Sequence, residues 1–304
     1  MAYILRDFGS YTVGGHVHRV TQGTTREVNF TRSASYTYDP RGSFRVGQTY
    51  VQYFIPERMR DAPPMVLVHG GGMHGSTWET TPDGRPGWLH LLLGRGYAVH
   101  VVDLVERGRS GFAAGIWNEA PILRSAEEAW SLFRIGAPEG YSQRRAHDAQ
   151  QFPVDHFDTF CSQMVPRWLN TSDLQVAGVV AVLDRLKCAT LVCHSQGGEI
   201  CLDATRERPD LVAGILAVEP SALPDAALPC PIALLAGDYL NTAPHWVQRR
   251  KDWQRSIRQI TETGRVAHYI DTATEVAPGG SHMLMMDQHG PECLEAGLAR
   301  LALV

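Results

Sequence analysis

Several features that would quickly assign a class of protein are missing from this sequence. It contains no Cys-x-x-Cys pair and no His-Glu-x-x-His motif, and its six cysteines show no framework spacing. No apolar run is long enough to span a membrane, and no basic region followed by an apolar core stands at the start, so no secretory signal is visible. We therefore expect reduced, mostly buried thiols and a cytoplasmic protein that does not bind membranes.

An excess of charge of one sign is also missing. The net charge is −4 over 304 residues, with both signs spread along the chain. This balance gives no electrostatic reason to expect a nucleic acid or an anionic membrane as a partner. Hydrophobic residues make up 44% of the chain, which permits a sizeable core and argues against general disorder. The length suits one large α/β domain or two small ones.

The most informative stretch runs from residue 189 to residue 200. A short apolar run ends in Ser195, which is followed by Gln196, two glycines and a helix-like sequence. This order is typical of a nucleophile elbow, in which a sharp turn between a strand and a helix presents a serine. We expect Ser195 to be a nucleophile and the backbone N–H of Gln196 to be one donor of an oxyanion hole.

The rest of the chain predicts an α/β fold with a mostly parallel central sheet and helices on both faces. Two strand-like pieces, 26–30 and 49–55, are separated by turn residues and predict an antiparallel hairpin at a sheet edge. Beyond residue 65, short apolar runs alternate with helical patterns. Buried strands are expected at 65–69, 98–104, 189–194, 214–219 and 232–236, and helices at 88–95, 172–186, 196–208 and 293–303.

Residues 112–171 interrupt this alternation between a predicted strand and the helix at 172–186. The segment is rich in aromatic residues, with helical stretches expected at 126–135 and 154–168. It is either a packing subdomain or a lid over the substrate, and long insertions in compact domains favour the lid. Residues 1–111 and 172–304 would then form the core of the α/β fold. The aromatic residues of the segment 112–171 include Trp117, Trp130, Phe133, Tyr141, Phe152, Phe157, Phe160 and Trp168, and Phe160 and Trp168 are candidates for substrate binding.

A serine nucleophile needs a base, and His282 is the best candidate. It lies in the glycine-rich stretch 278–283, after the last predicted strand and before the final helix. This is where the strand–elbow–helix architecture presents its histidine. His289 is the nearest rival, at the approach to the last helix.

The base in turn needs an acid that orients it, and two residues qualify. Glu219 ends a predicted strand and precedes Pro220, whereas Asp238 follows Gly237 at the end of the next strand. Both preserve the chain order serine, acid, histidine. We favour Glu219, because it ends an apolar run where a charge has no structural reason to stand, and Asp238 stays open as the alternative.

The second oxyanion donor is expected in the loop 69–72, which follows an early strand. Gly71 is the favoured donor and Gly72 the alternative, since glycines let the backbone approach a substrate closely. Gly72 and His194 are further candidates for substrate binding.

Two rival types of site are weak. Gly70, Gly72 and Gly75 match a dinucleotide fingerprint, but prolines follow where a helix must begin at once and no acidic residue lies about 20 residues further on. A Walker loop is absent. His16 and His18 alternate on one strand, but no third metal ligand can be named. The sequence therefore predicts neither a cofactor nor a metal.

Taken together, these motifs resemble the α/β-hydrolase superfamily over most of residues 60–304, and more narrowly the bacterial esterase-713-like group. The resemblance rests on the loop at 69–72, Asp103 with 107–110, the elbow at 193–198, the strand end at 218–220 and the loop at 279–282. It implies a Ser195–His282–Glu219 triad, ester hydrolysis without a cofactor, and a homodimer. Two departures are Cys193, where the elbow usually opens with glycine, and the absence of a carboxylate at 240–241, the usual acid position.

The sequence thus predicts a serine hydrolase that cleaves a carboxylic ester or lactone of a small, largely apolar substrate through an acyl-enzyme. Two alternatives from other classes stay open, because the fold does not decide the chemistry. One is a non-hydrolytic lyase or cyclase that uses the same residues. The other is a ligand-binding receptor on the same fold.

Overall fold

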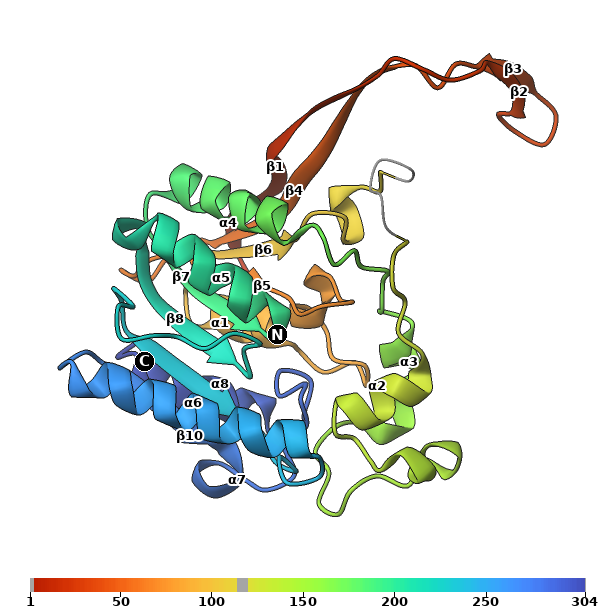
Figure 1. Cartoon of the computed structure of the whole chain (residues 1–304). Coiled ribbons are helices and arrows are strands. Elements are labelled where there is room, and N and C mark those ends of the chain that lie inside the picture. Colours follow the sequence, from red (N-terminus) through yellow and green to blue (C-terminus); the bar gives the residue numbers. More distant parts are fainter. Residues whose placement is uncertain (1–2, 114–119, 304) are drawn as a thin grey trace.

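The computed structural model describes residues 3–113 and 120–303, and its centre is an eight-stranded mixed sheet (Figure 1). The two strands at one edge are antiparallel to their neighbours, and the other pairs are parallel. In spatial order the strands are β1 (Leu5–Val20), β4 (Gly42–Pro56), β6 (Val99–Asp103), β5 (Met65–Val68), β7 (Ala189–His194), β8 (Val212–Val218), β9 (Ile232–Ala236) and β10 (Ala267–Asp271). This topology confirms the predicted fold class.

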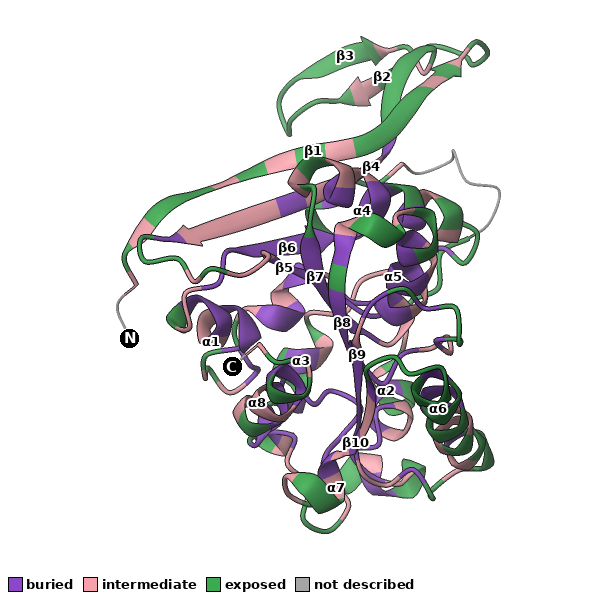
Figure 2. Cartoon of the chain, turned by 90° about the vertical axis from the view of Figure 1, so that its left-hand side faces the viewer, coloured by how far each residue is buried: buried purple, intermediate pink, exposed green. Residues whose placement is uncertain are grey.

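Helices cover both faces of the sheet. On one face lie α4 (Ser172–Leu186), α5 (Gln196–Glu207) and α6 (Pro244–Glu262), and on the other lie α1 (Trp88–Gly94) and α8 (Gly290–Arg300) (Figure 2). A short α7 (Thr272–Glu275) follows β10. Every residue of β5, β7 and β9 is buried, as expected for parallel strands covered on both faces. In the described part of the chain, no helix is both long and apolar enough to cross a membrane.

The antiparallel edge extends into a long arm (Figure 1). At its tip, β2 (Arg26–Asn29) and β3 (Ser35–Tyr38) pair in a separate two-stranded sheet. The predicted hairpin is therefore corrected: residues 49–55 belong to β4 but pair with β1, whereas residues 26–29 pair with β3. The pairing and length of β1 escaped prediction, because most of its side chains are exposed and it carries little apolar alternation.

The inserted segment is less helical than predicted. It contains α2 (Ala126–Leu132) and α3 (Phe157–Cys161), with 3-10 turns at Pro138–Gln143 and Val154–His156. The helix expected over 154–168 is wrong beyond Cys161, because Pro166 cannot continue a helix and Val165 N–H donates to Gly72 O instead (2.8 Å). Trp117 lies outside the described residues.

Aromatic side chains anchor this segment to the body of the molecule. They meet largely edge-to-face, with ring centroids 5.2 Å apart for Trp130 and Phe157 and 5.5 Å apart for Phe133 and Phe160. Their cluster also includes Met283 and Leu284, which follow the predicted base in sequence. The insertion therefore packs beside the predicted site, while its division from the core as a lid stays a prediction.

Candidate active site

Ser195 lies on a strained turn between β7 and α5. Its φ of 50° and ψ of −118° are unusual for a residue with a side chain, and α5 begins at the next residue. The turn is held on both sides, because Ser195 N donates to Val218 O (3.0 Å) and Ser221 N donates to Ser195 O (2.9 Å). A Cβ on Gly197 would lie 2.4 Å from His69 O, so only glycine fits there. The local geometry is that of the predicted elbow.

His282 is held beside this turn by contacts to its backbone and its ring. Its N–H donates to Phe133 O (2.9 Å), and its carbonyl oxygen accepts a hydrogen bond from His194 Nε2 (3.0 Å). Because His194 immediately precedes Ser195, this bond ties the base loop to the elbow. The His282 and His194 ring centroids are 4.6 Å apart, and the Phe133 ring stacks on His282 with an interplanar angle of 14°.

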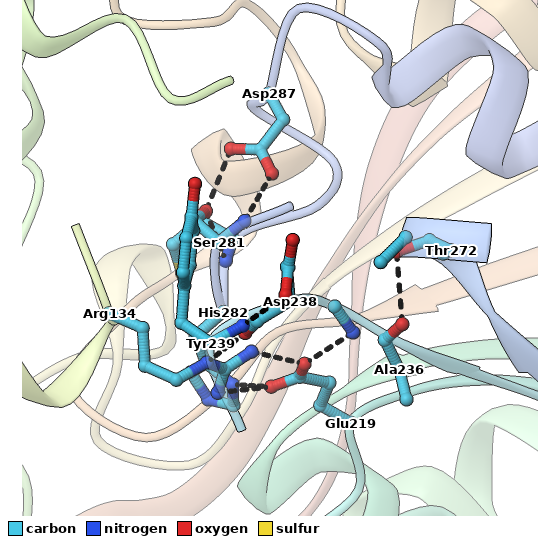
Figure 3. A network of polar contacts seen from close by, with 12 residues as sticks. Arg134, Glu219, Ala236, Asp238, Tyr239, Thr272, Ser281, His282 and Asp287 are labelled. Carbon is cyan, nitrogen blue, oxygen red and sulfur yellow. Dashed lines mark hydrogen bonds and ion pairs between the residues drawn. The ribbon is translucent and has the colours of Figure 1, made fainter. Parts of the chain in front are cut away.

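The His282 ring binds Glu219 through one nitrogen only. Nδ1 hydrogen-bonds to Glu219 Oε2 (Figure 3), which leaves Nε2 as the nitrogen that can exchange a proton. Among the described residues, no hydrogen bond joins Nε2 to Ser195 Oγ. Such contacts are often long in free enzymes and tighten when substrate binds.

Glu219 is a buried carboxylate with several partners. It directly follows β8 with a φ of 45°, and Gly237 N donates to its Oε1 (2.7 Å). Arg134 binds both carboxylate oxygens, with Nη1 2.9 Å from Oε2 (Figure 3). Burial alone raises the pKa of Glu219, but the positive charges of Arg134 and His282 outweigh it and lower the pKa to about 2. Glu219 is therefore ionised at neutral pH.

Arg134 is a residue of this site that the sequence did not reveal. It comes from the inserted segment directly after α2, and its side chain is fully buried. Arg134 Nε donates to Asp238 O (2.8 Å), and the guanidinium lies 4.3 Å from the centre of the Trp246 ring. The available signal was an arginine between the apolar residues Phe133 and Ile135, but nothing local shows where such a charge points.

The rival acid and the rival base lie in other environments. Asp238 Oδ2 accepts a hydrogen bond from Gly279 N (3.0 Å), and Oδ1 accepts one from Tyr239 N (2.7 Å). Asp238 thus holds the loop that leads to His282, and of the two candidate acids it is Glu219 that contacts the imidazole. His289 is buried at the start of α8, and neither of its ring nitrogens has a hydrogen-bond partner among the described residues.

The predicted oxyanion residues lie next to each other. As the first residue of α5, Gln196 has an N–H with no acceptor inside the helix. A Cβ on Gly71 would lie 2.7 Å from Gln196 Oε1, which shows how closely the two loops approach. Gly72 has a φ of +75°, and its carbonyl oxygen accepts the Val165 N–H. The assignment of Gly71 and Gln196 as donors stays a prediction.

The candidates for substrate binding are all largely buried. Trp168 is 3% exposed, and its ring centroid lies 4.9 Å from that of Phe112. Phe160 is fully buried behind Phe133, and His194 is engaged with the backbone of His282. Their role in substrate binding, like that of Gly72, stays a prediction.

A second buried carboxylate supports the base loop. Asp287 accepts hydrogen bonds from the N–H and the hydroxyl of Ser281, both at 2.7 Å (Figure 3). Burial raises the pKa of Asp287 to about 7, although these two hydrogen bonds act in the opposite direction. Asp287 thereby fixes the residue that precedes His282.

The structure gives the glycine-rich loop no dinucleotide-binding geometry. Gly75 begins a four-residue 3-10 turn, and its N–H donates to Asp103 Oδ1 (2.7 Å). The next α-helix along the chain starts only at Trp88, so the loop does not lead directly into a helix as a dinucleotide site requires. Over residues 3–113 and 120–303, no group of three or more His, Cys, Asp or Glu side chains is arranged to hold a metal.

Comparison with known proteins assigns the class. The model of the alpha/beta hydrolase family matches residues 65–261, and the chain belongs to that family. A solved structure of a bacterial esterase is 28% identical with a TM-score of 0.85, covering 97% of this chain and 95% of that one. A fungal protein named "Probable secreted lipase phiG" (Fungal sp., strain ATCC 74256) is 30% identical over 192 residues. That match covers 60% of this chain and 52% of the fungal protein, so the chain matches about half the length of this relative.

These findings confirm the resemblance to α/β hydrolases and bacterial esterases that the motifs predicted. The protein is a member of the alpha/beta hydrolase family, and its similarity to an esterase and a lipase supports ester hydrolysis in general.

Proposed function

We propose that this protein is a serine esterase that cleaves a carboxylic ester or lactone of a small substrate through a Ser195 acyl-enzyme. The observation that carries the proposal is the buried pair of His282 and Glu219. Nδ1 of the imidazole is bound to the carboxylate, and the ring lies beside the strained turn that presents Ser195. An orienting acid, a base and a nucleophile in this order are what acyl transfer requires.

In the acylation step, Ser195 Oγ attacks the ester carbonyl carbon, and His282 Nε2 takes the hydroxyl proton. The carbonyl oxygen becomes an oxyanion that the N–H groups of Gly71 and Gln196 stabilise. Glu219 keeps the neutral imidazole in the tautomer with its proton on Nδ1 and then stabilises the imidazolium. The tetrahedral intermediate collapses, the ester C–O bond breaks, and His282 returns its proton to the leaving alcohol.

Deacylation repeats these steps with water as the nucleophile. His282 removes a proton from water as it attacks the acyl carbon, and the same two N–H groups hold the second oxyanion. Collapse breaks the bond to Ser195 Oγ, which regains its proton from His282 and releases the acid. No cofactor or metal enters this sequence.

The proposal is tested by Ser195→Ala, assayed with short 4-nitrophenyl esters. We expect kcat to fall about 10⁶-fold, because the bond-forming atom is lost. Ser162→Ala is the matched control, since the Ser162 side chain is exposed and donates only to Asp158 O (2.9 Å) within its own turn. Equal turnover by Ser195→Ala and the control would exclude Ser195 from the mechanism.

A homodimer and a cytoplasmic location remain part of the proposal. All six cysteines are free, and four of them are buried, which supports a reducing compartment. Light scattering of the purified protein tests the dimer, and fractionation of the source cells tests the location.

A further inference from the structure

A guanidinium group lies directly over the predicted oxyanion loop. A Cβ on Gly71 would lie only 2.1 Å from Arg167 Nη1, and the same nitrogen donates to Gln196 Oε1 (3.4 Å). Arg167 therefore reaches both residues that are expected to hold the oxyanion. Both Arg167 and Ser195 are only partly buried, so each keeps some contact with solvent.

The backbone fixes Arg167 in this position. Its N–H and carbonyl form a two-way bridge with Ile122, with distances of 3.0 and 2.8 Å. Two residues earlier, Val165 N–H donates to Gly72 O (2.8 Å), which ties this strip of the insertion to the oxyanion loop itself. The arginine is thus built into the site and is not a loose surface side chain.

Arg167 has no carboxylate partner among the described residues. The two other arginines of the insertion that lie near the site are paired, Arg134 with Glu219 and Arg124 with Glu128. Arg167 forms no such ion pair, and its Nε is buried without a hydrogen-bond acceptor. A buried guanidinium nitrogen without an acceptor loses hydration without a compensating hydrogen bond, unless a ligand supplies one. Glu128 and Glu199 attract the charge of Arg167, but neither is within ion-pair distance among the described residues.

A second arginine also has a buried guanidinium nitrogen without an acceptor among the described residues. Arg107 lies in the turn after β6, is only 1% exposed, and has a buried Nη2 without an acceptor in the described part of the chain. Its Nη1 reaches only the carbonyl oxygen of Glu106, at 3.3 Å. Burial and the charge of Arg167 lower the pKa of Arg107 to about 10, although the Glu106 carboxylate opposes this. The two arginines therefore lie close enough for their positive charges to interact.

The geometry points to an anion subsite beside Ser195, in which Arg167 binds a carboxylate carried by the ester substrate and the buried Arg107 adds positive potential. A planar carboxylate fits the guanidinium fork, and only one of the two forks is open to solvent, which suits a group with a single negative charge. The inference rests on the proposed function and deepens it. The substrate is a small ester whose apolar body ends in an acid.

A competing role for Arg167 makes the inference testable. If Arg167 donated to the oxyanion instead, it would act on every ester alike, because every ester develops that charge. If it binds a substrate carboxylate, it acts only on esters that carry one. The informative quantity is therefore the preference of the enzyme for an anionic ester over a neutral one, measured as the ratio of their kcat/KM values.

Two matched pairs of esters place the carboxylate on either side of the scissile bond. The first pair is mono-4-nitrophenyl adipate and its methyl ester, and the second is 4-carboxyphenyl hexanoate and its methyl ester. We expect Arg167→Met to reduce the preference for the anionic ester by about 10- to 100-fold in at least one pair, the usual effect of one hydrogen bond to a charged group. Arg167→Lys keeps the charge without the fork and should retain part of the preference.

Arg144→Met is the control, because it removes another arginine of the insertion that already has a carboxylate partner, the exposed Asp158, and it should leave the ratio unchanged. Far-UV circular dichroism and thermal unfolding confirm that each variant is folded. The carboxylate subsite is overturned if Arg167→Met leaves the ratio of kcat/KM for the anionic over the neutral ester unchanged in both pairs. This includes the case in which kcat/KM falls equally for anionic and neutral esters. Ser195-dependent hydrolysis of the neutral esters shows separately whether the proposed function holds.

Discussion

Arg134 Nη1 lies 2.9 Å from Glu219 Oε2, so a side chain from the insertion binds the carboxylate that contacts His282. The preceding residue, Phe133, accepts the backbone N–H of His282 (2.9 Å) and stacks on its ring. Two consecutive residues of the segment 112–171 therefore hold both the acid and the base. The surroundings of the acid and the base are therefore complete only when this segment is in place.

The first prediction concerns this ion pair. Replacing Arg134 with methionine leaves Glu219 buried without its main counter-charge, and breaking a buried ion pair costs about 3–5 kcal/mol. We expect the free energy of unfolding of Arg134→Met to fall by that amount, measured by urea titration, and kcat to fall about 100-fold through misplacement of His282. Arg144→Met is the control, because its partner Asp158 is exposed and such a pair contributes about 0–1 kcal/mol.

The acid is tested by comparing Glu219→Gln with Asp238→Asn. Glu219→Gln keeps the size of the side chain but loses the charge that orients the imidazole, so kcat should fall about 10⁴-fold. Asp238→Asn loses one acceptor in the loop at Gly279, and its effect should be on stability, by about 1–3 kcal/mol. A larger loss of kcat in Asp238→Asn than in Glu219→Gln would transfer the role of the acid to Asp238.

The third prediction concerns the pH dependence of activity. Burial lowers the pKa of His282 below its ordinary value of 6.5, and Arg134 lowers it further, while Glu219 acts in the opposite direction. The reaction needs neutral imidazole, so kcat/KM should rise with pH through a pKa below 6.5 and be level above it. Arg134→Met removes a positive charge that lowers this pKa, so the acid limb should move to higher pH. If the acid limb of the kcat/KM profile lies at the same pH in Arg134→Met and in the parent, Arg134 does not influence the pKa of His282.

Asp287 makes the free energy of unfolding depend on pH. Stability falls as pH rises, whereas kcat/KM rises with pH. Its folded pKa of about 7 lies above the ordinary value of 3.8, so between about pH 4 and 7 the native state binds a proton that the unfolded state has released. Through this group the free energy of unfolding falls as pH rises over that window, by up to about 1.4 kcal/mol per pH unit. In Asp287→Asn that contribution should vanish, and the variant should gain stability relative to the parent at pH 8. The exposed Asp155→Asn serves as the control, and identical pH curves for Asp287→Asn and the parent would contradict this account.

The residues that could be predicted from sequence are those with a local signature. Ser195 follows an apolar strand and precedes two glycines, Glu219 ends the next strand, and His282 lies in a glycine-rich loop. Each signature fixes a place at the carboxyl edge of a parallel sheet, so the three were expected to meet there. The preference for Glu219 over Asp238 rested on the apolar run that Glu219 ends, and the structure adds that Glu219 is the one whose side chain contacts the imidazole.

The residues that escaped prediction act over long sequence distances. Arg134 and Arg167 lie in irregular backbone of the insertion, and nothing in their local sequence shows that they turn toward Glu219 and Gly71. The same applies to the long helix α6. Its many charged residues masked a real helical signal, namely Pro244 at its first turn and a buried apolar face that includes Trp246, Trp253 and Ile257. Tertiary packing determines whether such segments form helices, and the periodicity of apolar residues alone predicts them only weakly.

The central claim, that Ser195 is the nucleophile activated by His282 and Glu219, is tested most directly by trapping the covalent enzyme. The protein is treated with a fluorophosphonate, digested, and the modified peptide is identified by mass spectrometry. The account predicts one adduct, on Ser195, that forms in proportion to the loss of esterase activity and forms much more slowly in Glu219→Gln. Modification of a different residue, or full esterase activity in protein whose Ser195 is modified, would contradict it.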